Sequence, residues 1–243
     1  MDDCPVNGLY PSEDNAIRQA TVVVVPAYRE ERVVGATIAG ICAAGWRVVL
    51  VDDGSDDGTA SAAAAAGATV LRHPVNLGQG AALRTGFAWA LRSRSVRYVV
   101  TFDADGQHST EAIDNLVQPL AHDQVDVTLG SRFLESNSRA AVPATRRLLL
   151  HTATRLARWT TDLALTDTHN GLRAFRIEAL RCLDLRQDRM AHASEILAEI
   201  ARHRLTVREV SVQVAYTDYS RAKGQSMIDA VSILWDLIIS RAR

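Results

Sequence analysis

The chain has 243 residues, of which 47% are hydrophobic and 23% are charged, and its formal net charge is −1. These values are typical of a soluble globular protein with a sizeable core, and the near-neutral charge argues against a general nucleic-acid binder. Cys4, Cys42 and Cys182 are scattered and lack metal-ligand spacing, which predicts reduced thiols in a cytoplasmic protein. Apolar runs stay below the roughly 18 residues of a membrane span, and the acidic start does not resemble a signal peptide.

The order of apolar runs predicts the fold. The first 19 residues are polar and contain two prolines, which predicts a flexible arm over residues 1–19. Strands and helices then alternate, as in a parallel sheet with helices on both faces. Predicted strands cover residues 21–25, 46–51, 69–72, 97–102, 126–130, 172–175 and 206–215. Predicted helices extend to about residue 45 and cover 60–66, 76–93, 111–121, 143–161, 193–203 and 226–241. We expect one domain over 20–225, followed by an amphipathic helix over 226–243.

The fourth predicted strand runs directly into two aspartates, Asp103 and Asp105, which are followed by Gln107 and His108. Ligands of parallel sheets gather beyond the carboxyl ends of the strands. Two carboxylates with no Lys or Arg among them repel each other unless a cation lies between them. Oxygen ligands of this kind suit Mg²⁺ or Mn²⁺, especially beside phosphates. The same residue types also form ordinary turns, so the motif alone supports both interpretations.

A second acidic motif, Asp52-Asp53, ends the second predicted strand and shares this edge of the sheet. A carboxylate there can accept a hydrogen bond from a ribose hydroxyl or a base N–H. The alternative is a turn in which Asp56 or Thr59 caps the next helix. The pair Gly78 and Gly80 is part of a dinucleotide fingerprint but does not follow the first strand, which disfavours a Rossmann oxidoreductase. We expect these glycines to let a helix pack close to the site.

Five motifs, taken together and in order, resemble those of family 2 glycosyltransferases with the GT-A fold. The resemblance is strongest to the polyprenyl-phosphate (dolichol-phosphate) glycosyltransferases and covers about residues 21 to 225. It implies an α/β fold with a mixed, mostly parallel sheet flanked by helices. It also implies an inverting, metal-dependent transfer of a sugar from a UDP- or GDP-sugar to a polyprenyl monophosphate. The motifs lie at residues 26–31, 52–59, 76–80, 103–108 and 130–132.

The resemblance also implies where the donor and its metal bind. The divalent cation, Mg²⁺ or Mn²⁺, would be held by Asp103, Asp105 and Gln107. Arg221, Lys223 and Gln225 would form a basic loop that closes over the donor diphosphate or the acceptor phosphate. The implied donor-binding residues are Pro26, Ala27, Tyr28, Glu30, Asp52, Asp53, Gly80, Asp103, Ala104, Asp105, Arg221 and Lys223.

For the acceptor, the resemblance implies that Arg132 meets the phosphate and that residues 167–173, with Asp167, Asn170, Gly171 and Arg173, help to wall the site. A metal with Arg and Lys would neutralise the leaving diphosphate. An anionic phosphate acceptor needs little help from a general base, and Glu195 would then order Arg132 or a loop. A neutral hydroxyl acceptor would need a base, for which Glu195 and Asp105 are candidates. The candidate catalytic residues are therefore Asp105, Arg132 and Glu195.

Three other functions are compared with this one. A glycosyltransferase that acts on a hydroxyl of a saccharide or small molecule would use the same donor site. A non-catalytic nucleotide-sugar-binding scaffold is disfavoured, because a binding remnant could lose Asp103, Asp105, Arg132 and Arg221 freely. A nucleotidyltransferase is disfavoured because the loop after the first strand lacks a glycine-rich, basic character. A zinc site is also disfavoured, since the histidines show no ligand spacing.

The partners follow from the acceptor. A polyprenyl phosphate resides in a membrane, so we expect a cytoplasmic protein that is peripheral at the membrane or carried by a membrane protein. The helix over 226–243 has a broad apolar face, and its acidic polar face favours core packing or a partner over lipid. The Arg-rich segment between residues 132 and 158 is a second candidate for anionic lipid heads, although a solvated helix face is the commoner case.

Overall fold

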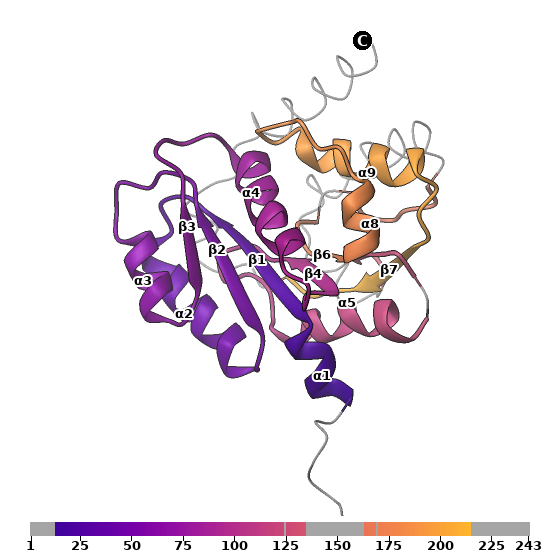
Figure 1. The fold of residues 1–243 in the computed structure, drawn as a ribbon, viewed down its shortest axis with the longest axis horizontal. Helices are drawn as coiled ribbons and strands as arrows, with labels where there is room; N and C mark the ends of the chain where they lie inside the picture. Colours follow the sequence, from indigo (N-terminus) through magenta and orange to yellow (C-terminus); the bar gives the residue numbers. More distant parts are fainter. Residues whose placement is uncertain (1–12, 124, 135–162, 169, 215–243) are drawn as a thin grey trace, which may run out of the picture.

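The computed structural model describes residues 13–123, 125–134, 163–168 and 170–214. These residues form one sheet of seven strands in the order β3-β2-β1-β4-β6-β5-β7, covered by helices on both faces (Figure 1). Only β6 runs against its neighbours β4 and β5, and the other described pairs are parallel. The mixed, mostly parallel sheet is therefore confirmed. The strands are β1 Thr21–Ala27, β2 Arg47–Asp52, β3 Thr69–Arg72, β4 Tyr98–Thr101, β5 Val127–Ser131, β6 Arg173–Arg176 and β7 Val207–Ser211.

Residue alternation in β1 shows why the sheet has helices on both sides. Val23 and Val25 belong to one hydrophobic cluster, whereas Val22 and Val24 belong to the other, because successive strand side chains point to opposite faces. α2 and α5 cover the first face, and α4 and α9 cover the second. The described helices are α1 Glu13–Gln19, α2 Glu31–Ala43, α3 Thr59–Ala65, α4 Gln79–Arg92, α5 Glu111–His122, α8 Ile177–Cys182 and α9 His192–Arg202.

Two sequence predictions need correction at the start of the chain. Residues 13–19 form α1 rather than a flexible arm: Ile17 is buried, and the Arg18 guanidinium donates to the Ala44 carbonyl. Pro26 was expected to end the first strand, but β1 continues to Ala27. A proline fits there because the pairing of β1 with β4 ends at Val24, so its missing N–H removes nothing from that ladder. Residues 1–12 and the predicted helices over 143–161 and 226–243 lie outside the described residues.

The carboxyl ends of β1 to β5 lie at one edge of the sheet. β1 to β4 are mutually parallel, and β5 has the same direction because both β4 and β5 are antiparallel to β6. The loops after these five strands therefore share this edge, which lies opposite α1 in Figure 1. We call it the carboxyl edge. Within the described ranges, no helix has the length and apolar character needed to cross a membrane.

Candidate active site

Asp103 and Asp105 lie in the loop after β4 at the carboxyl edge. The Asp103 carboxylate lies 3.5 Å from His108 Nε2 and accepts a hydrogen bond from the Gln79 amide. Burial alone would raise the pKa of Asp103, but the hydrogen bond and charge of His108 hold it below its ordinary value. Burial and the negative charge of Asp103 raise the pKa of Asp105. The two carboxylates therefore repel each other.

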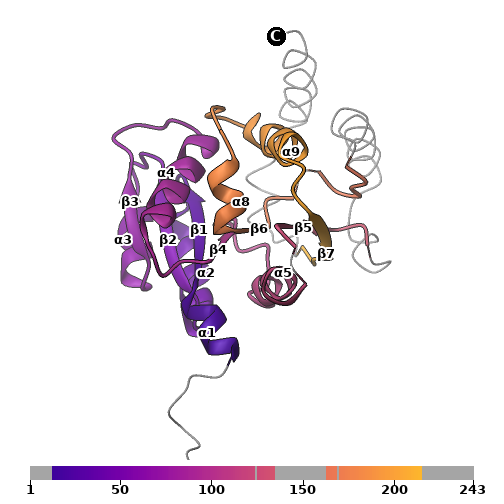
Figure 2. The same cartoon turned by 45° about the vertical axis from the view of Figure 1, so that its right-hand side comes forward.

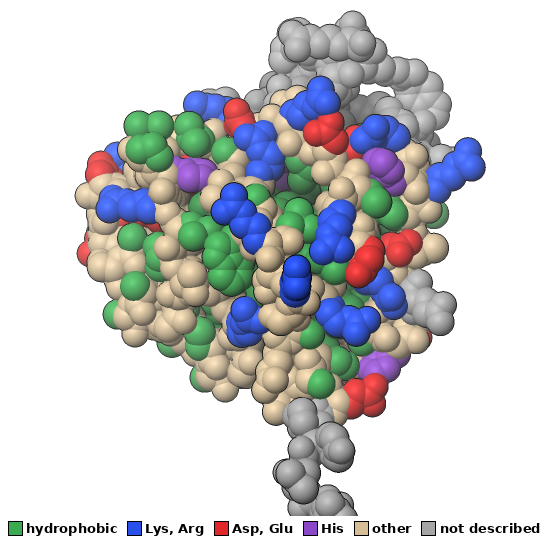
Figure 3. Space-filling model, in the orientation of Figure 1, with side chains coloured by type: hydrophobic (Ala, Val, Ile, Leu, Met, Phe, Trp, Pro, Cys, Tyr) green, Lys and Arg blue, Asp and Glu red, His purple; other side chains and the backbone are tan. Residues whose placement is uncertain are grey.

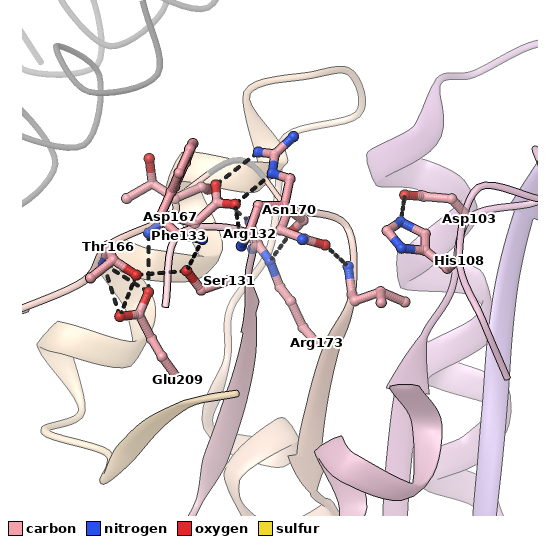
Figure 4. A network of polar contacts seen from close by, with 12 residues as sticks. Asp103, His108, Ser131, Arg132, Phe133, Thr166, Asp167, Asn170, Arg173 and Glu209 are labelled. Atoms are coloured by element: carbon pink, nitrogen blue, oxygen red, sulfur yellow. Dashed lines mark hydrogen bonds and ion pairs between the residues drawn. The ribbon is translucent and has the colours of Figure 1, made fainter. Parts of the chain in front are cut away.

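Gly171 and Arg173 support Asp103 from the side of β6. A Cβ atom at position 171 would lie 2.3 Å from Asp103 Oδ2, so only glycine permits this approach. The buried Arg173 guanidinium donates to the backbone carbonyls of Asn170 and Thr168 (Figure 4). Burial lowers the pKa of Arg173 to about 10 despite the nearby negative charges of Asp167 and Asp103. A fixed positive charge thus lies behind Asp103 at neutral pH.

The residues of this loop fit a divalent cation such as Mg²⁺ or Mn²⁺. Asp105 accepts hydrogen bonds from the backbone N–H of Gln107 at 3.1 Å and from its side-chain nitrogen at 2.6 Å. Gln107 would therefore offer a cation its amide oxygen. The described residues contain no group of three or more His, Cys, Asp or Glu side chains arranged for a metal. Mg²⁺ usually binds through one or two carboxylates and completes its shell with water and substrate phosphates.

Both carboxylate oxygens of Asp53 accept hydrogen bonds from the loop between β3 and α4. Its Oδ1 lies 2.7 Å from His73 Nδ1 and accepts the Leu77 N–H, and its Oδ2 accepts the Gly78 N–H at 2.7 Å. His73 Nε2 in turn lies 2.8 Å from the Thr85 hydroxyl. Asp53 is buried, and its contacts fix the loop between β3 and α4. The sequence did not distinguish Asp52 from Asp53 as the nucleotide-reading residue, and it gave His73 no function.

Asp52 differs from Asp53 although the two are adjacent. Its Oδ1 accepts the Ser55 N–H at 3.0 Å. Its Oδ2 lies 3.1 Å from Arg72 Nε, but no donor among the described residues is aligned to form a hydrogen bond with it. The Asp52 side chain is fully buried, so this oxygen depends on its ion pair with Arg72.

The loop after β1 forms the adjoining wall. The Arg29 N–H donates to the Ser55 hydroxyl, and the Glu30 N–H donates to the Thr59 hydroxyl, so the loops after β1 and β2 are tied together. The Arg29 guanidinium lies 5.2 Å from the centre of the Tyr28 ring. Of the remaining predicted donor residues, Glu30 and Ala104 are buried, Tyr28 is half-buried, and Pro26 and Ala27 form the buried end of β1.

The loop between α8 and α9, residues 183–191, crosses the start of α4 (Figures 1 and 2). We call it the strap. A Cβ atom would lie 2.4 Å from a strap carbonyl oxygen at Gly78 and 2.1 Å from one at Gly80. The Ala81 N–H donates to the Asp188 carbonyl. The two glycines therefore permit close backbone packing beside the site, as expected, although the neighbour is the strap.

Glu195 holds the strap from the first turn of α9. Its carboxylate accepts the N–H groups of Arg186 and Gln187, each at 2.9 Å. Glu199, one turn later, accepts the Asp184 N–H at 2.9 Å. These are the contacts of a residue that orders a loop, one of the two interpretations open for Glu195.

Arg132, which follows β5, is buried and bound to Asp167 through two hydrogen bonds. The distances are 2.6 Å from Nε to Oδ2 and 2.8 Å from Nη2 to Oδ1. Glu209 of β7 fixes the turn that carries Asp167, since it accepts the backbone N–H groups of Thr166 at 2.8 Å and Asp167 at 3.0 Å (Figure 4). Ser131 completes the network through the Thr166 hydroxyl. The sequence analysis missed Glu209, whose only signal was an acidic residue on an alternating strand.

Figure 4 places the Arg132–Asp167 network on one side of Asn170 and Arg173 and the Asp103–His108 pair on the other. The structure therefore brings Asp52, Asp103, Asp105 and Arg132 to the carboxyl edge. Asp52 ends β2, Asp103 and Asp105 follow β4, and Arg132 follows β5. Arg221, Lys223 and Gln225, predicted as a basic loop, lie outside the described residues.

A mixed sheet with these acidic strand ends is the GT-A architecture of nucleotide-sugar transferases. The family model described as Glycosyl transferase family 2 matches residues 22–184. The chain therefore belongs to glycosyltransferase family 2 and is a glycosyltransferase.

Three similar proteins illustrate this membership. The chain is 35% identical to an uncharacterized protein of Methanocaldococcus jannaschii, over 95% of this chain and 96% of that one. It is 27% identical to the UDP-N-acetylglucosamine–dolichyl-phosphate N-acetylglucosaminyltransferase of Methanococcus voltae, over 89% and 94%. Glucosyl-3-phosphoglycerate synthase from Mycobacterium tuberculosis, solved with Mg²⁺ and uridine diphosphate, shares the fold with a TM-score of 0.68, at 20% identity over 93% and 80%.

Proposed function

We propose that this glycosyltransferase moves one sugar, with inversion, from a UDP-sugar to a polyprenyl monophosphate with the help of Mg²⁺ or Mn²⁺. The observation that carries the proposal is the Asp103–Asp105 pair at the carboxyl edge, in which burial and the charge of Asp103 raise the pKa of Asp105. A cation on a nucleoside diphosphate would relieve that repulsion. The name of the Methanococcus voltae relative, which pairs a UDP-sugar with dolichyl phosphate, supports the same reaction.

The choice of UDP over GDP rests on Asp52. Its Oδ1 already accepts the Ser55 N–H, whereas its Oδ2 is buried beside Arg72 Nε and lacks an aligned hydrogen-bond donor among the described residues. Uracil presents one N–H between two carbonyl groups, which suits a single acceptor oxygen with the Arg72 guanidinium beside it. Guanine presents an N–H and an adjacent amino group, which need two acceptors. Asp53 would act indirectly, by fixing the loop between β3 and α4.

The bound cation would supply charge neutralisation to the diphosphate as it leaves. Asp103 and Asp105 would hold that cation, with the Gln107 amide oxygen as a further ligand. An acceptor phosphate oxygen would form a bond to the anomeric carbon on the face opposite the breaking bond to the diphosphate, which inverts that carbon. Since the acceptor oxygen is already anionic, no base is required, and Asp105 and Glu195 would not transfer protons.

Arg132 would contact the acceptor phosphate, held in place by Asp167. Guanidinium groups bind phosphate through fixed, parallel N–H donors, and Asp167 restricts the rotation of this one through two short hydrogen bonds. Arg221, Lys223 and Gln225 would close over the phosphates, as the family resemblance implies. Glu195 would keep the strap against the start of α4.

The test is an assay with Mg²⁺ or Mn²⁺, a panel of labelled UDP- and GDP-sugars and a polyprenyl phosphate. We expect labelled lipid from a UDP-sugar and none after chelation of the metal. Labelled saccharide without labelled lipid would instead indicate a hydroxyl acceptor. Binding of UDP without any transfer would indicate a scaffold, and transfer from GDP-sugars alone would contradict the assignment of Asp52.

A further inference from the structure

The large hydrophobic side chains that are exposed in the described residues all lie at the carboxyl edge. Val75 is 58% exposed, Leu77 43%, Leu134 44% and Met190 39%. Val75 and Leu77 follow β3, and Leu134 follows β5, so the direction of these strands places all three at that edge. Single exposed apolar residues are common on protein surfaces. Their restriction to the edge that carries Asp103 and Asp105 is the observation that needs an explanation.

Three of these side chains lie on a ridge formed by two segments that pack against each other. A Cβ atom at Gly78 would lie 2.4 Å from the Asp188 carbonyl oxygen and 2.9 Å from Arg189 Cγ, so the strap packs directly on the loop between β3 and α4. Figure 3 shows hydrophobic surface over that loop, next to Lys or Arg side chains. We call this ridge the rim and define it as Val75, Leu77, Arg189 and Met190.

Hydrogen bonds and an ion pair hold the two segments of the rim in place. The buried Asp53 carboxylate accepts the N–H groups of Leu77 and Gly78. On the strap side, Glu195 accepts two N–H groups, and Asp188 binds Arg84 through its side chain at 2.5 Å. Apolar side chains that stay in water gain no free energy of burial. They gain it when another surface covers them.

The charges around the rim favour an anionic surface. The strap acids each have an arginine partner, since Asp184 pairs with Arg186 and Asp188 with Arg84. Arg189 is exposed and adds a further positive charge beside Leu77 and Met190. Glu199 pairs with Arg202, and Glu195 accepts two strap N–H groups, whereas Arg189 forms no ion pair with the described residues.

We propose that the rim docks on the surface of a bilayer that contains anionic lipids. Val75, Leu77 and Met190 would enter the boundary between headgroups and acyl chains, and Arg189 would lie among the lipid phosphates. A few apolar side chains with an adjacent cation suffice for interfacial binding. They are too few for a stable protein interface, which buries about 800 Å² on each partner.

The inference rests on the proposed function in one respect, because a membrane-embedded acceptor would need the site to face the bilayer. The rim adjoins that site: Gln79, the residue after Gly78, donates to the Asp103 carboxylate. Docking through the rim would hold the acceptor phosphate at the level of the site while its chain stays in the membrane.

The experiment is flotation of the full chain with vesicles that contain neither acceptor nor nucleotide. We expect binding to vesicles of phosphatidylcholine and phosphatidylglycerol, and a loss of at least about tenfold in the double variant Val75→Ser/Leu77→Gln. Arg189→Gln should weaken binding to the anionic vesicles and leave binding to pure phosphatidylcholine unchanged. Arg94→Gln is the matched control, since it removes an exposed arginine at the opposite edge and should change neither. Met190→Gln provides an independent change on the strap.

Equal flotation of the wild type and the double variant would overturn the inference, as would no flotation of the wild type. A dimer that dissociates in the double variant, without vesicle binding, would assign the rim to a second copy and also overturn it. Transfer to a water-soluble short-chain prenyl phosphate, measured without vesicles, tests the proposed function separately. The double variant should keep that transfer and lose transfer to the same phosphate on a membrane-embedded chain. Rim-dependent flotation without any transfer would contradict the proposed function and support the rim.

Discussion

Two acidic strand ends look alike in the sequence and differ in the structure. After β2, Asp53 gives both oxygens to its own chain, to His73, Leu77 and Gly78. After β4, the Asp105 carboxylate receives hydrogen bonds from Gln107, and burial together with the charge of Asp103 raises its pKa. The comparison teaches that neighbouring donors decide the function of a carboxylate. One acid stabilises a loop, and the other is the one that we propose as a cation ligand.

The largest expected effect is on turnover in Asp105→Asn. The change keeps the shape of the side chain, replaces one of its two acceptor oxygens with an NH2 group, and removes the charge that would hold the cation. We expect transfer to fall on the order of a thousandfold with little change in thermal stability. Initial rates and a melting curve measure the two effects. Transfer within a factor of two of the wild type would contradict this assignment of Asp105.

The change Asp53→Ala should show the opposite pattern and mainly affect stability. It would leave two part-buried N–H groups and the buried His73 without their acceptor, so the free energy of unfolding should fall by about 3 to 5 kcal/mol. Asp56→Ala, which removes an exposed carboxylate paired with Arg29, is the matched control and should unfold like the wild type. Denaturant unfolding measures both. Equal stability of the two variants would remove the distinction between the two strand ends.

His192 gives a pH dependence of stability with a defined sign. It is buried at the start of α9, and burial lowers its pKa from 6.5 to about 4. Between these values the unfolded chain binds more protons, so the contribution of His192 is fully present above pH 6.5 and is lost as the pH falls toward 4. The loss amounts to about 3 kcal/mol. We expect the difference in unfolding free energy between wild type and His192→Gln to shrink over this range, and a constant difference would contradict the burial of a neutral imidazole.

The smallest expected effect concerns Glu209, which acts on Arg132 indirectly through Asp167. Glu209→Gln should loosen the turn that carries Asp167 and thereby the orientation of Arg132. We expect KM for the acceptor to rise about fivefold, with KM for the donor unchanged, since the loss of one charge-assisted hydrogen bond is worth about 1 kcal/mol. Glu178→Gln, on α8, is the control. An equal rise for donor and acceptor would show that Glu209 acts only on overall folding.

The sequence predicted the parts of the molecule that depend on local pattern. Strand-helix alternation gave the parallel half of the sheet, and an apolar run ending in acids located Asp103 and Asp105. It missed α1 and α8, which have only seven and six residues and therefore carry little periodic signal. The sequence also predicted that β1 ends before Pro26, because a proline disfavours a strand. The pairing of β1 with β4 ends at Val24, so the proline does not interrupt it.

The rest of the site depends on contacts between distant residues. Asp52 and Asp53 are neighbours in the sequence, and only the positions of Arg72, His73 and Leu77 separate their functions. Glu209 reaches Asp167 across 42 residues, which no local pattern records. The strap explains Gly78 and Gly80, because the close neighbour of these glycines is a backbone about 110 residues further along the chain.

The central claim is that Asp103 and Asp105 hold a divalent cation on the donor diphosphate. Titration of Mn²⁺ into the protein, with and without UDP, tests it most directly, because it requires neither acceptor nor turnover. We predict one Mn²⁺ site that tightens when UDP is present and is lost in Asp105→Asn, while Asp53→Asn keeps it. Equal Mn²⁺ binding in the wild type and Asp105→Asn would contradict the claim.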